Sequence, residues 1–75
     1  MHRTYRLDGQ HVTVTWIHRQ HPPVYMIRVA GVPVAGSVER TALGRFRAID
    51  AQGRPLGTFT GLRAAVESVA REARR

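Results

Sequence analysis

Cysteine, lysine and asparagine are absent from this sequence of 75 residues, and only five residues are acidic. Without cysteine the chain can form neither a disulfide bond nor a thiolate metal site, so we expect no covalent crosslink in the fold. No apolar run approaches the roughly 20 residues of a membrane-spanning helix, and the first residues lead into an alternating strand pattern instead of the apolar segment of a signal peptide. These absences predict a cytoplasmic protein without a membrane partner.

The charge of the chain is strongly unbalanced. Twelve arginines stand against the five acidic residues, which gives a formal net charge of +7 at pH 7. A compact surface with such an excess favours a polyanionic partner, because each contacted phosphate releases condensed counterions. The preference for arginine over lysine is typical of a GC-rich genome, so the inference depends on the net charge and not on the residue type. We therefore expect a nucleic acid, and duplex DNA in particular, as the partner.

The length of the chain predicts one small basic domain, residues 1–75. We expect an N-terminal hairpin with a third strand over residues 1–35, followed by a β-meander and a helix over residues 36–75. A chain of this size buries only roughly 60–65% of its unfolded surface. A symmetric homodimer would bury more, so the homodimer stays an alternative to the monomer.

Alternating apolar and polar residues predict strands in the N-terminal part. Residues 4–7 and 10–17 flank Asp8-Gly9, a pair typical of a type I′ turn, so Leu7 is expected opposite Gln10. In this register one face of the hairpin belongs to the core: Tyr5, Leu7, Val12, Val14 and Trp16. Residues 24–30 predict a third strand, and residues 31–33 a turn or a poorly paired edge segment.

The C-terminal part predicts three short strands and one helix. The strands are expected over residues 37–41, 45–50 and 55–59, and the helix over about residues 61–74 with Thr60 as its N-cap. Opposite an i,i+4 charge ladder of Arg63, Glu67 and Arg71, the helix carries one apolar stripe: Leu62, Ala65, Val66, Val69, Ala70 and Ala73. The predicted fold class is therefore α+β, with a small antiparallel sheet of about five or six short strands packed against one C-terminal helix.

Three motifs in residues 36–75 carry a resemblance to known DNA-binding domains. They are Arg45-Phe46-Arg47-Ala48 in the middle strand, the turn of residues 50–54, and Gly57-Thr58-Phe59 before the helix. With them, this segment resembles the small DNA-binding domain at the amino terminus of tyrosine integrases and is similar to the plant ethylene-response-factor domain. In those families the sheet lies in the major groove and the helix packs behind it. The resemblance implies the same for the strand residues of this chain.

Four arginines are the candidate nucleic-acid-binding residues: Arg40, Arg45, Arg47 and Arg54. Because Phe46 is expected to pack against the helix, alternation along its strand turns Arg45 and Arg47 outward, with the other two close by at strand and turn ends. Guanidiniums gathered on one side of a sheet can bind phosphates. The same pattern is also compatible with an ordinary solvated sheet face. The remaining N-terminal arginines are interpreted as scattered surface residues: Arg3, Arg6, Arg19 and Arg28.

These features predict a non-enzymatic nucleic-acid-binding module, for instance an accessory or regulatory protein of phage or plasmid type. The alternative is a small protein-protein interaction module, such as a phage-encoded inhibitor. It would dock on an acidic protein surface with the same arginines and with an exposed edge strand around residues 24–34.

No catalytic residue, metal ion or cofactor is expected. Asp8 and Asp50 are explained by turns, and Glu67 and Glu72 by the helix charge ladders. Neither Ser37 nor Ser68 has a histidine and an acid that could activate it. Four histidines lie within the first 21 residues, but without cysteine or a nearby carboxylate their spacing does not match a zinc site: His2, His11, His18 and His21. Trp16 and Tyr25 are interpreted as core residues and not as platforms for nucleic-acid bases.

Overall fold

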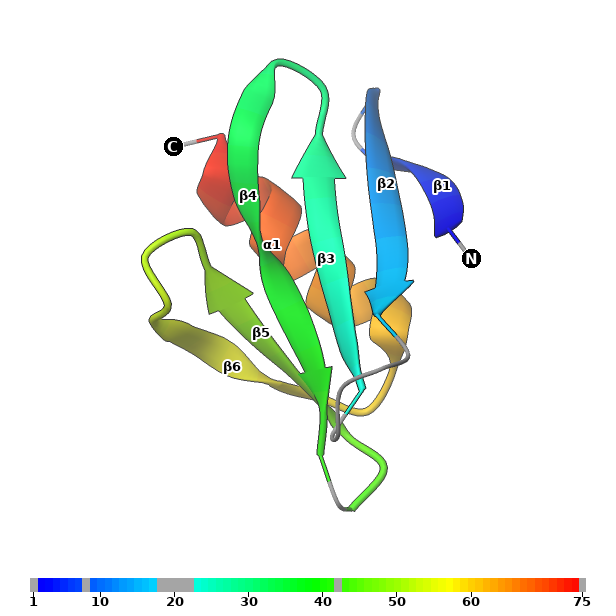
Figure 1. Ribbon diagram of the computed structural model, residues 1–75, viewed down its shortest axis with the longest axis vertical. Coiled ribbons are helices and arrows are strands. Elements are labelled where there is room, and N and C mark those ends of the chain that lie inside the picture. The colour runs from blue at the N-terminus through cyan, green and yellow to red at the C-terminus, as the bar shows by residue number, and fades with distance from the viewer. Residues whose placement is uncertain (1, 8, 18–22, 42, 75) are drawn as a thin grey trace.

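Six antiparallel strands form one sheet in which each strand lies beside its neighbours in the sequence, and one helix packs on one face of it (Figure 1). The computed structural model describes residues 2–7, 9–17, 23–41 and 43–74. The elements are β1 (His2–Leu7), β2 (Gln10–Ile17), β3 (Val24–Val29), β4 (Val32–Arg40), β5 (Phe46–Asp50), β6 (Pro55–Phe59) and α1 (Leu62–Ala73). The predicted α+β class, with its antiparallel sheet and C-terminal helix, is confirmed.

The core lies between α1 and the sheet face that α1 covers. The register of the first hairpin is the predicted one, with Leu7 opposite Gln10 and Tyr5 opposite Val12; Asp8 lies outside the described residues. The helix stripe is also confirmed, because four of its members are buried: Ala65, Val66, Val69 and Ala70. The helix packs against β3, β4, β5 and β6, and its buried side chains belong to one cluster with apolar residues of the sheet, among them Val12, Val14, Ile27, Val38 and Ala48.

Strand β4 differs from the sequence prediction. It begins at Val32 and not at residue 37, and it continues through the expected junction between residues 35 and 36. The physical reason is the tight turn before it, where Gly31 adopts φ +81° and returns the chain directly beside β3. Pro33 falls in the segment where the register between β3 and β4 shifts, a place where a missing backbone donor is tolerated. The predicted exposed edge around residues 24–34 is therefore wrong, since β3 and β4 are inner strands of the sheet.

Gly36 allows β4 to approach both β5 and the helix. Its φ of +148° is a conformation that L-residues other than glycine rarely adopt. A Cβ atom built on Gly36 would clash with the carbonyl oxygen of Ile49 and would lie 2.9 Å from Cγ1 of Val69. Glycine is thus required at this position both by the backbone conformation and by the space beneath it.

The helix start and one aromatic residue also depart from the sequence prediction. Gly61, not Thr60, is the N-cap of α1, and no side-chain hydrogen bond caps the helix. Trp16 keeps 37% of its surface exposed, because it lies near the end of the sheet and stacks on Tyr25 at a centroid distance of 6.4 Å instead of entering the core. Within the described part of the chain, no helix is both long enough and apolar enough to cross a membrane.

Candidate nucleic-acid interface

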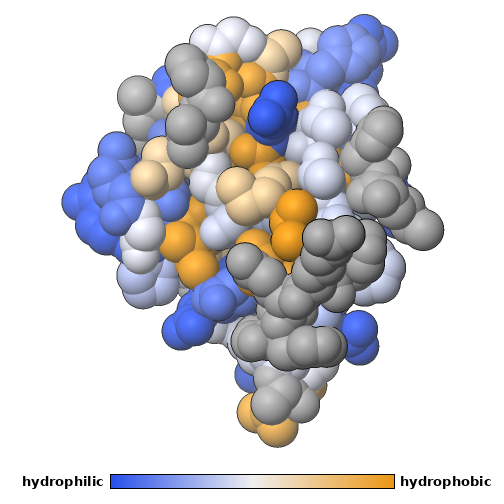
Figure 2. Space-filling model, in the orientation of Figure 1, coloured by the Kyte–Doolittle hydropathy of each residue, from blue (hydrophilic) through white to orange (hydrophobic). Residues whose placement is uncertain are grey.

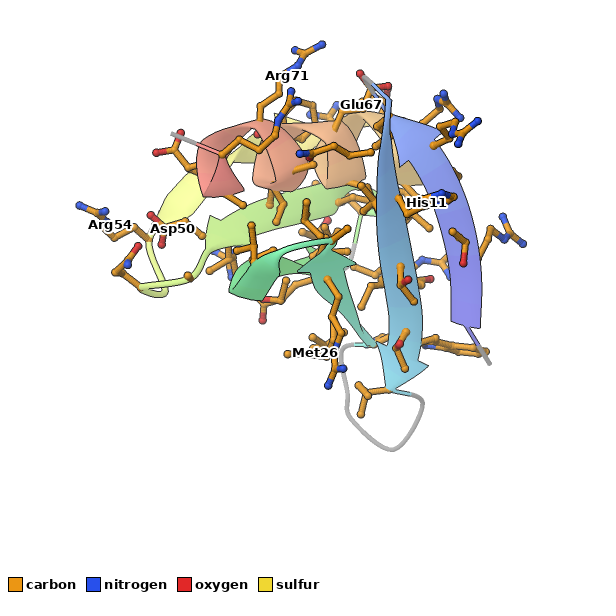
Figure 3. All side chains as sticks on the ribbon, turned by 90° about the horizontal axis from the view of Figure 1, so that it is seen from above. His11, Met26, Asp50, Arg54, Glu67 and Arg71 are labelled. Atoms are coloured by element: carbon orange, nitrogen blue, oxygen red, sulfur yellow. The ribbon has the colours of Figure 1, made fainter. Side chains whose placement is uncertain are left out.

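One face of the sheet is left uncovered by the described elements. The N-terminal hairpin extends the sheet sideways through the β2–β3 pairing and does not fold over it, while α1 covers the other face. In Figure 3, Met26 points away from the helix, and Glu67 and Arg71 lie on the far side of α1. We call this uncovered surface the open face. Strand alternation and register assign to it Thr4, Arg6, His11, Thr13, Thr15, Ile17, Val24, Met26, Arg28, Ser37, Glu39, Arg47, Ile49 and Thr58.

The open face combines hydroxyl, apolar and basic side chains. Figure 2 shows hydrophobic atoms in the centre of this view, between hydrophilic groups at its margins. Met26 is 44% exposed there. Every aromatic side chain of the described residues belongs to the opposite register, as Tyr25 and Phe46 illustrate by packing against the core. The open face therefore offers contacts to a nucleic-acid backbone but no aromatic platform on which bases could stack.

Apart from Arg47 on β5, the basic side chains of the open face gather at one end, across β1, β2 and β3. Arg6 is paired with His11 in the register, and Thr13 with Arg28. His11, Thr13 and Arg28 also line a shallow pocket of about 360 Å³, together with Val29, Ala30 and Val32. From residue 9 to residue 38 the sequence contains no acidic residue. This end of the face thus presents donors and positive charge with no carboxylate on the three described strands.

Two of the four predicted binding arginines are neutralised by carboxylates. Nη2 of Arg47 lies 3.0 Å from Oε1 of Glu39, which faces it across the β4–β5 pairing. Nε of Arg54 lies 3.1 Å from Oδ2 of Asp50. The backbone N–H of Arg54 holds the pKa of Asp50 below its usual value; partial burial opposes this shift, and the Gln52 N–H and the guanidinium of Arg54 add to it. At neutral pH both pairs are charge-compensated, so neither arginine adds to the net positive charge.

The turns before and after β5 share one geometry. In the β4–β5 turn (residues 41–45) the Thr41 N–H donates to the Arg45 carbonyl at 2.7 Å, and the Gly44 N–H donates to the Thr41 carbonyl at 3.1 Å. In the β5–β6 turn (residues 50–54) the same two bonds are made by Asp50 and Gly53, at 2.9 and 3.0 Å. Gly44 and Gly53 both have positive φ, +74° and +83°. The two segments read Thr-Ala-Leu-Gly-Arg and Asp-Ala-Gln-Gly-Arg.

The first residue of each turn decides whether its arginine is neutralised. A side-chain oxygen of Thr41 accepts the Arg45 N–H at 3.3 Å, as Oδ1 of Asp50 accepts the Arg54 N–H at 2.8 Å. Asp50 has a second carboxylate oxygen that binds the guanidinium, whereas Thr41 has none. Arg45 therefore keeps its charge without a carboxylate partner among the described residues.

Arg40 does not lie on the open face, contrary to the expectation that four guanidiniums share one side of the sheet. Its Cα is paired with that of Phe46, whose side chain packs against the core, so Arg40 projects to the α1 side. Arg45 precedes Phe46 and continues the alternation on the open side. Arg40 and Arg45, neither of which has a carboxylate partner among the described residues, thus flank the β4–β5 turn on opposite sides.

Other arginines of the described chain also differ in whether a carboxylate lies beside them. On α1, Glu67 lies 3.5 Å from Arg63 and 3.4 Å from Arg71, so the predicted ladder is present and compensates much of the charge on the outer face of the helix. Arg6 and Arg28, which the sequence pattern predicts to be scattered, are brought together with His11 on neighbouring strands. The signal for this grouping is the long acid-free stretch combined with the hairpin register.

The described histidine and acidic side chains do not gather into a metal site. Among the residues that the structure describes, no group of three or more histidine, cysteine, aspartate or glutamate side chains could hold a metal ion. His18 and His21 lie outside those residues, as does Arg19.

No protein-family model matches the chain, and neither a curated protein nor a solved structure matches it significantly.

Proposed function

We propose that this protein is a non-enzymatic module that binds duplex nucleic acid through its backbone phosphates. The binding residues are four arginines to which the described chain supplies no carboxylate: Arg6 and Arg28 on the open face, and Arg40 and Arg45 beside the β4–β5 turn. His11 and the threonines of β1 and β2 supply further donors to phosphate oxygens.

The segregation of the arginines carries this proposal. Arg47, Arg54, Arg63 and Arg71 form ion pairs. By contrast, the described residues supply no carboxylate to Arg6 and Arg28 on the open face or to Arg40 and Arg45 at the β4–β5 turn. An ordinary solubilising surface mixes both signs of charge. Arg6, Arg28, Arg40 and Arg45 instead group positive charge that the described chain does not compensate, and a polyanion is the partner that such a surface attracts.

The width of the sheet determines which part of the protein can enter a groove of the duplex. Six strands at spacings of about 4.8 Å make a sheet about 24 Å across. The major groove is only about 12 Å wide and admits a two-stranded β-ribbon or a helix. The open face as a whole must therefore lie across the phosphate backbones, and only a hairpin end such as the β4–β5 turn can enter a groove. In Figure 1 this turn extends beyond the rest of the described sheet.

The proposal is tested by a salt titration of binding to a labelled duplex of about 25 base pairs, followed by fluorescence anisotropy. Four phosphate contacts predict a slope of log K against log salt of about −3.6, which corresponds to a loss of affinity of about 100-fold between 50 and 200 mM salt. Replacing Arg40 and Arg45 by Gln should reduce the steepness of the slope by about 2.

The matched control is the pair Arg63→Gln and Arg71→Gln, which removes the same net charge from the helix face. It should change the slope by much less, because these arginines already face Glu67. Equal losses for the two double variants would mean that the attraction is diffuse and has no defined surface. Absence of duplex binding by the wild type at 50 mM salt would reject the nucleic-acid proposal and favour the acidic protein partner.

A further inference from the structure

The apex of the β4–β5 turn carries an apolar side chain in a position where the turn itself does not need one. Leu43 is 85% exposed, about twice as exposed as the next large hydrophobic residue, Met26. Single apolar residues are common on protein surfaces and need no explanation by themselves. The β5–β6 turn, however, has the same backbone hydrogen bonds and places Gln52 at the equivalent position. The turn geometry is thus compatible with a polar residue, so it does not explain why residue 43 is leucine.

The surroundings of Leu43 suggest that reason. The backbone bonds between Thr41 and Arg45 hold the apex away from the core, so Leu43 cannot fold back to bury itself. Arg40 and Arg45 flank the apex on opposite sides of the hairpin, and neither has a carboxylate partner in the described part of the chain. A nucleic-acid groove is bordered by two rows of phosphates, and the stacked bases between them are apolar. A turn with an apolar tip between two cations is complementary to this arrangement.

We infer that the β4–β5 turn enters a groove of the duplex and that Leu43 inserts between two base pairs, so that the protein bends the nucleic acid it binds. Side chains such as leucine act as wedges of this kind in the minor groove, where partial unstacking of one step kinks the duplex. Arg40 and Arg45 contact the phosphates on the two borders of that groove. This inference rests on the proposed function and adds the part of the nucleic acid that is recognised and the deformation that results.

The test uses a duplex of about 25 base pairs with a donor and an acceptor fluorophore at its ends. Binding of the wild type should raise the energy-transfer efficiency, because a kink shortens the distance between the ends. The Leu43→Gln variant gives the β4–β5 turn the apex residue of the β5–β6 turn. It should bind with about five- to tenfold lower affinity, because the buried apolar contact is lost. Its salt slope should stay unchanged, because both arginines remain, and the energy transfer should no longer rise.

The matched control is Gln52→Leu, which places the same side chain on a turn whose arginine is neutralised by Asp50. Because Leu43 is still present, this variant should bend the duplex and bind it as the wild type does, and Gln52→Leu combined with Leu43→Gln should not restore the bending. Bending by Leu43→Gln equal to that of the wild type would overturn the insertion and leave phosphate binding intact. Binding by the wild type without any rise in energy transfer would do the same.

Two further outcomes would also overturn the inference: the wild type does not bind duplex, or it binds membranes through Leu43. If the wild type does not bind duplex at 50 mM salt, the proposed function is rejected and the insertion with it. An exposed leucine between cations could also anchor in a bilayer, so the wild type is tested in parallel on vesicles with 30% phosphatidylglycerol. Binding to vesicles that depends on Leu43 and exceeds duplex binding would overturn the inference. Circular dichroism of each variant confirms that the compared proteins are folded.

Discussion

Replacing Gly36 by Ala should unfold much of the protein, although it adds only one methyl group. The φ of +148° at this position would strain an alanine by about 1–3 kcal/mol. The added Cβ would press on the Ile49 carbonyl and on Cγ1 of Val69 at 2.9 Å, and overpacking of this kind costs about 1–3 kcal/mol more. A domain of 75 residues has a total stability of about 4–11 kcal/mol. The expected loss of about 2–6 kcal/mol is therefore a large fraction of that stability.

Urea unfolding of Gly36→Ala and Gly31→Ala, monitored by circular dichroism, separates the cost of backbone strain from the cost of overpacking. Gly31 also has positive φ, +81°, but a Cβ atom there would meet nothing within 4 Å. Its substitution should cost only the strain of about 1–2 kcal/mol. With a denaturant slope near 1 kcal/mol per molar urea for a small domain, Gly36→Ala should unfold at least about 2 M earlier than the wild type. Equal midpoints for the two variants would refute the close approach of β4 to α1 and β5.

Three further predictions concern the stability of the fold. Val66 is fully buried, so Val66→Ala should lower the free energy of unfolding by about 1–3 kcal/mol in urea titrations, and an unchanged midpoint would exclude Val66 from the core. Because the pKa of Asp50 is lowered in the folded state, its ionised form stabilises the fold above the unfolded-state pKa. Asp50→Asn should thus be less stable than the wild type at pH 7, and the difference should shrink as the pH falls below about 3.8; a difference that is the same at pH 3 and pH 7 would contradict this. A chelator should leave the melting temperature unchanged, and a lowered melting temperature would reveal a structural metal ion.

The sequence pattern predicts the parts of the fold that depend on local geometry. The Asp8-Gly9 pair and the alternation around it determine the register of the first hairpin, which places Tyr5 opposite Val12 as expected. The apolar stripe of α1 likewise identifies the buried side chains Val66 and Val69. The start of β4 cannot be predicted in the same way, because Pro33 signals a break unless the register shift beside β3 is known. Alternation alone assigns Trp16 to the core, because it does not report how near a residue lies to the end of the sheet.

The candidate interface could be predicted only in part. Composition shows the excess of arginine, but compensation by carboxylates depends on which residues face each other. The pair of Arg47 with Glu39 follows from the β4–β5 register, and that register is set by the turn of residues 41–45. The repeated pattern of Ala, one variable residue, Gly and Arg in the two turns is visible in the sequence. Its meaning depends on the hydrogen bonds, which show that Thr41 and Asp50 occupy equivalent positions.

The most direct test of the account is duplex binding by the Thr41→Asp variant, measured as a function of salt. This variant gives the β4–β5 turn the carboxylate that Asp50 supplies in the β5–β6 turn, so Arg45 should become neutralised as Arg54 is. The affinity at 100 mM salt should fall about five- to tenfold, and the salt slope should become shallower by about 1, which is the contribution of one phosphate contact. The control is Ala64→Glu on the exposed side of α1, which adds the same negative charge away from the proposed surface. Wild-type affinity and slope for Thr41→Asp, or an equal loss for Ala64→Glu, would contradict the claim that arginines without carboxylate partners bind the phosphates.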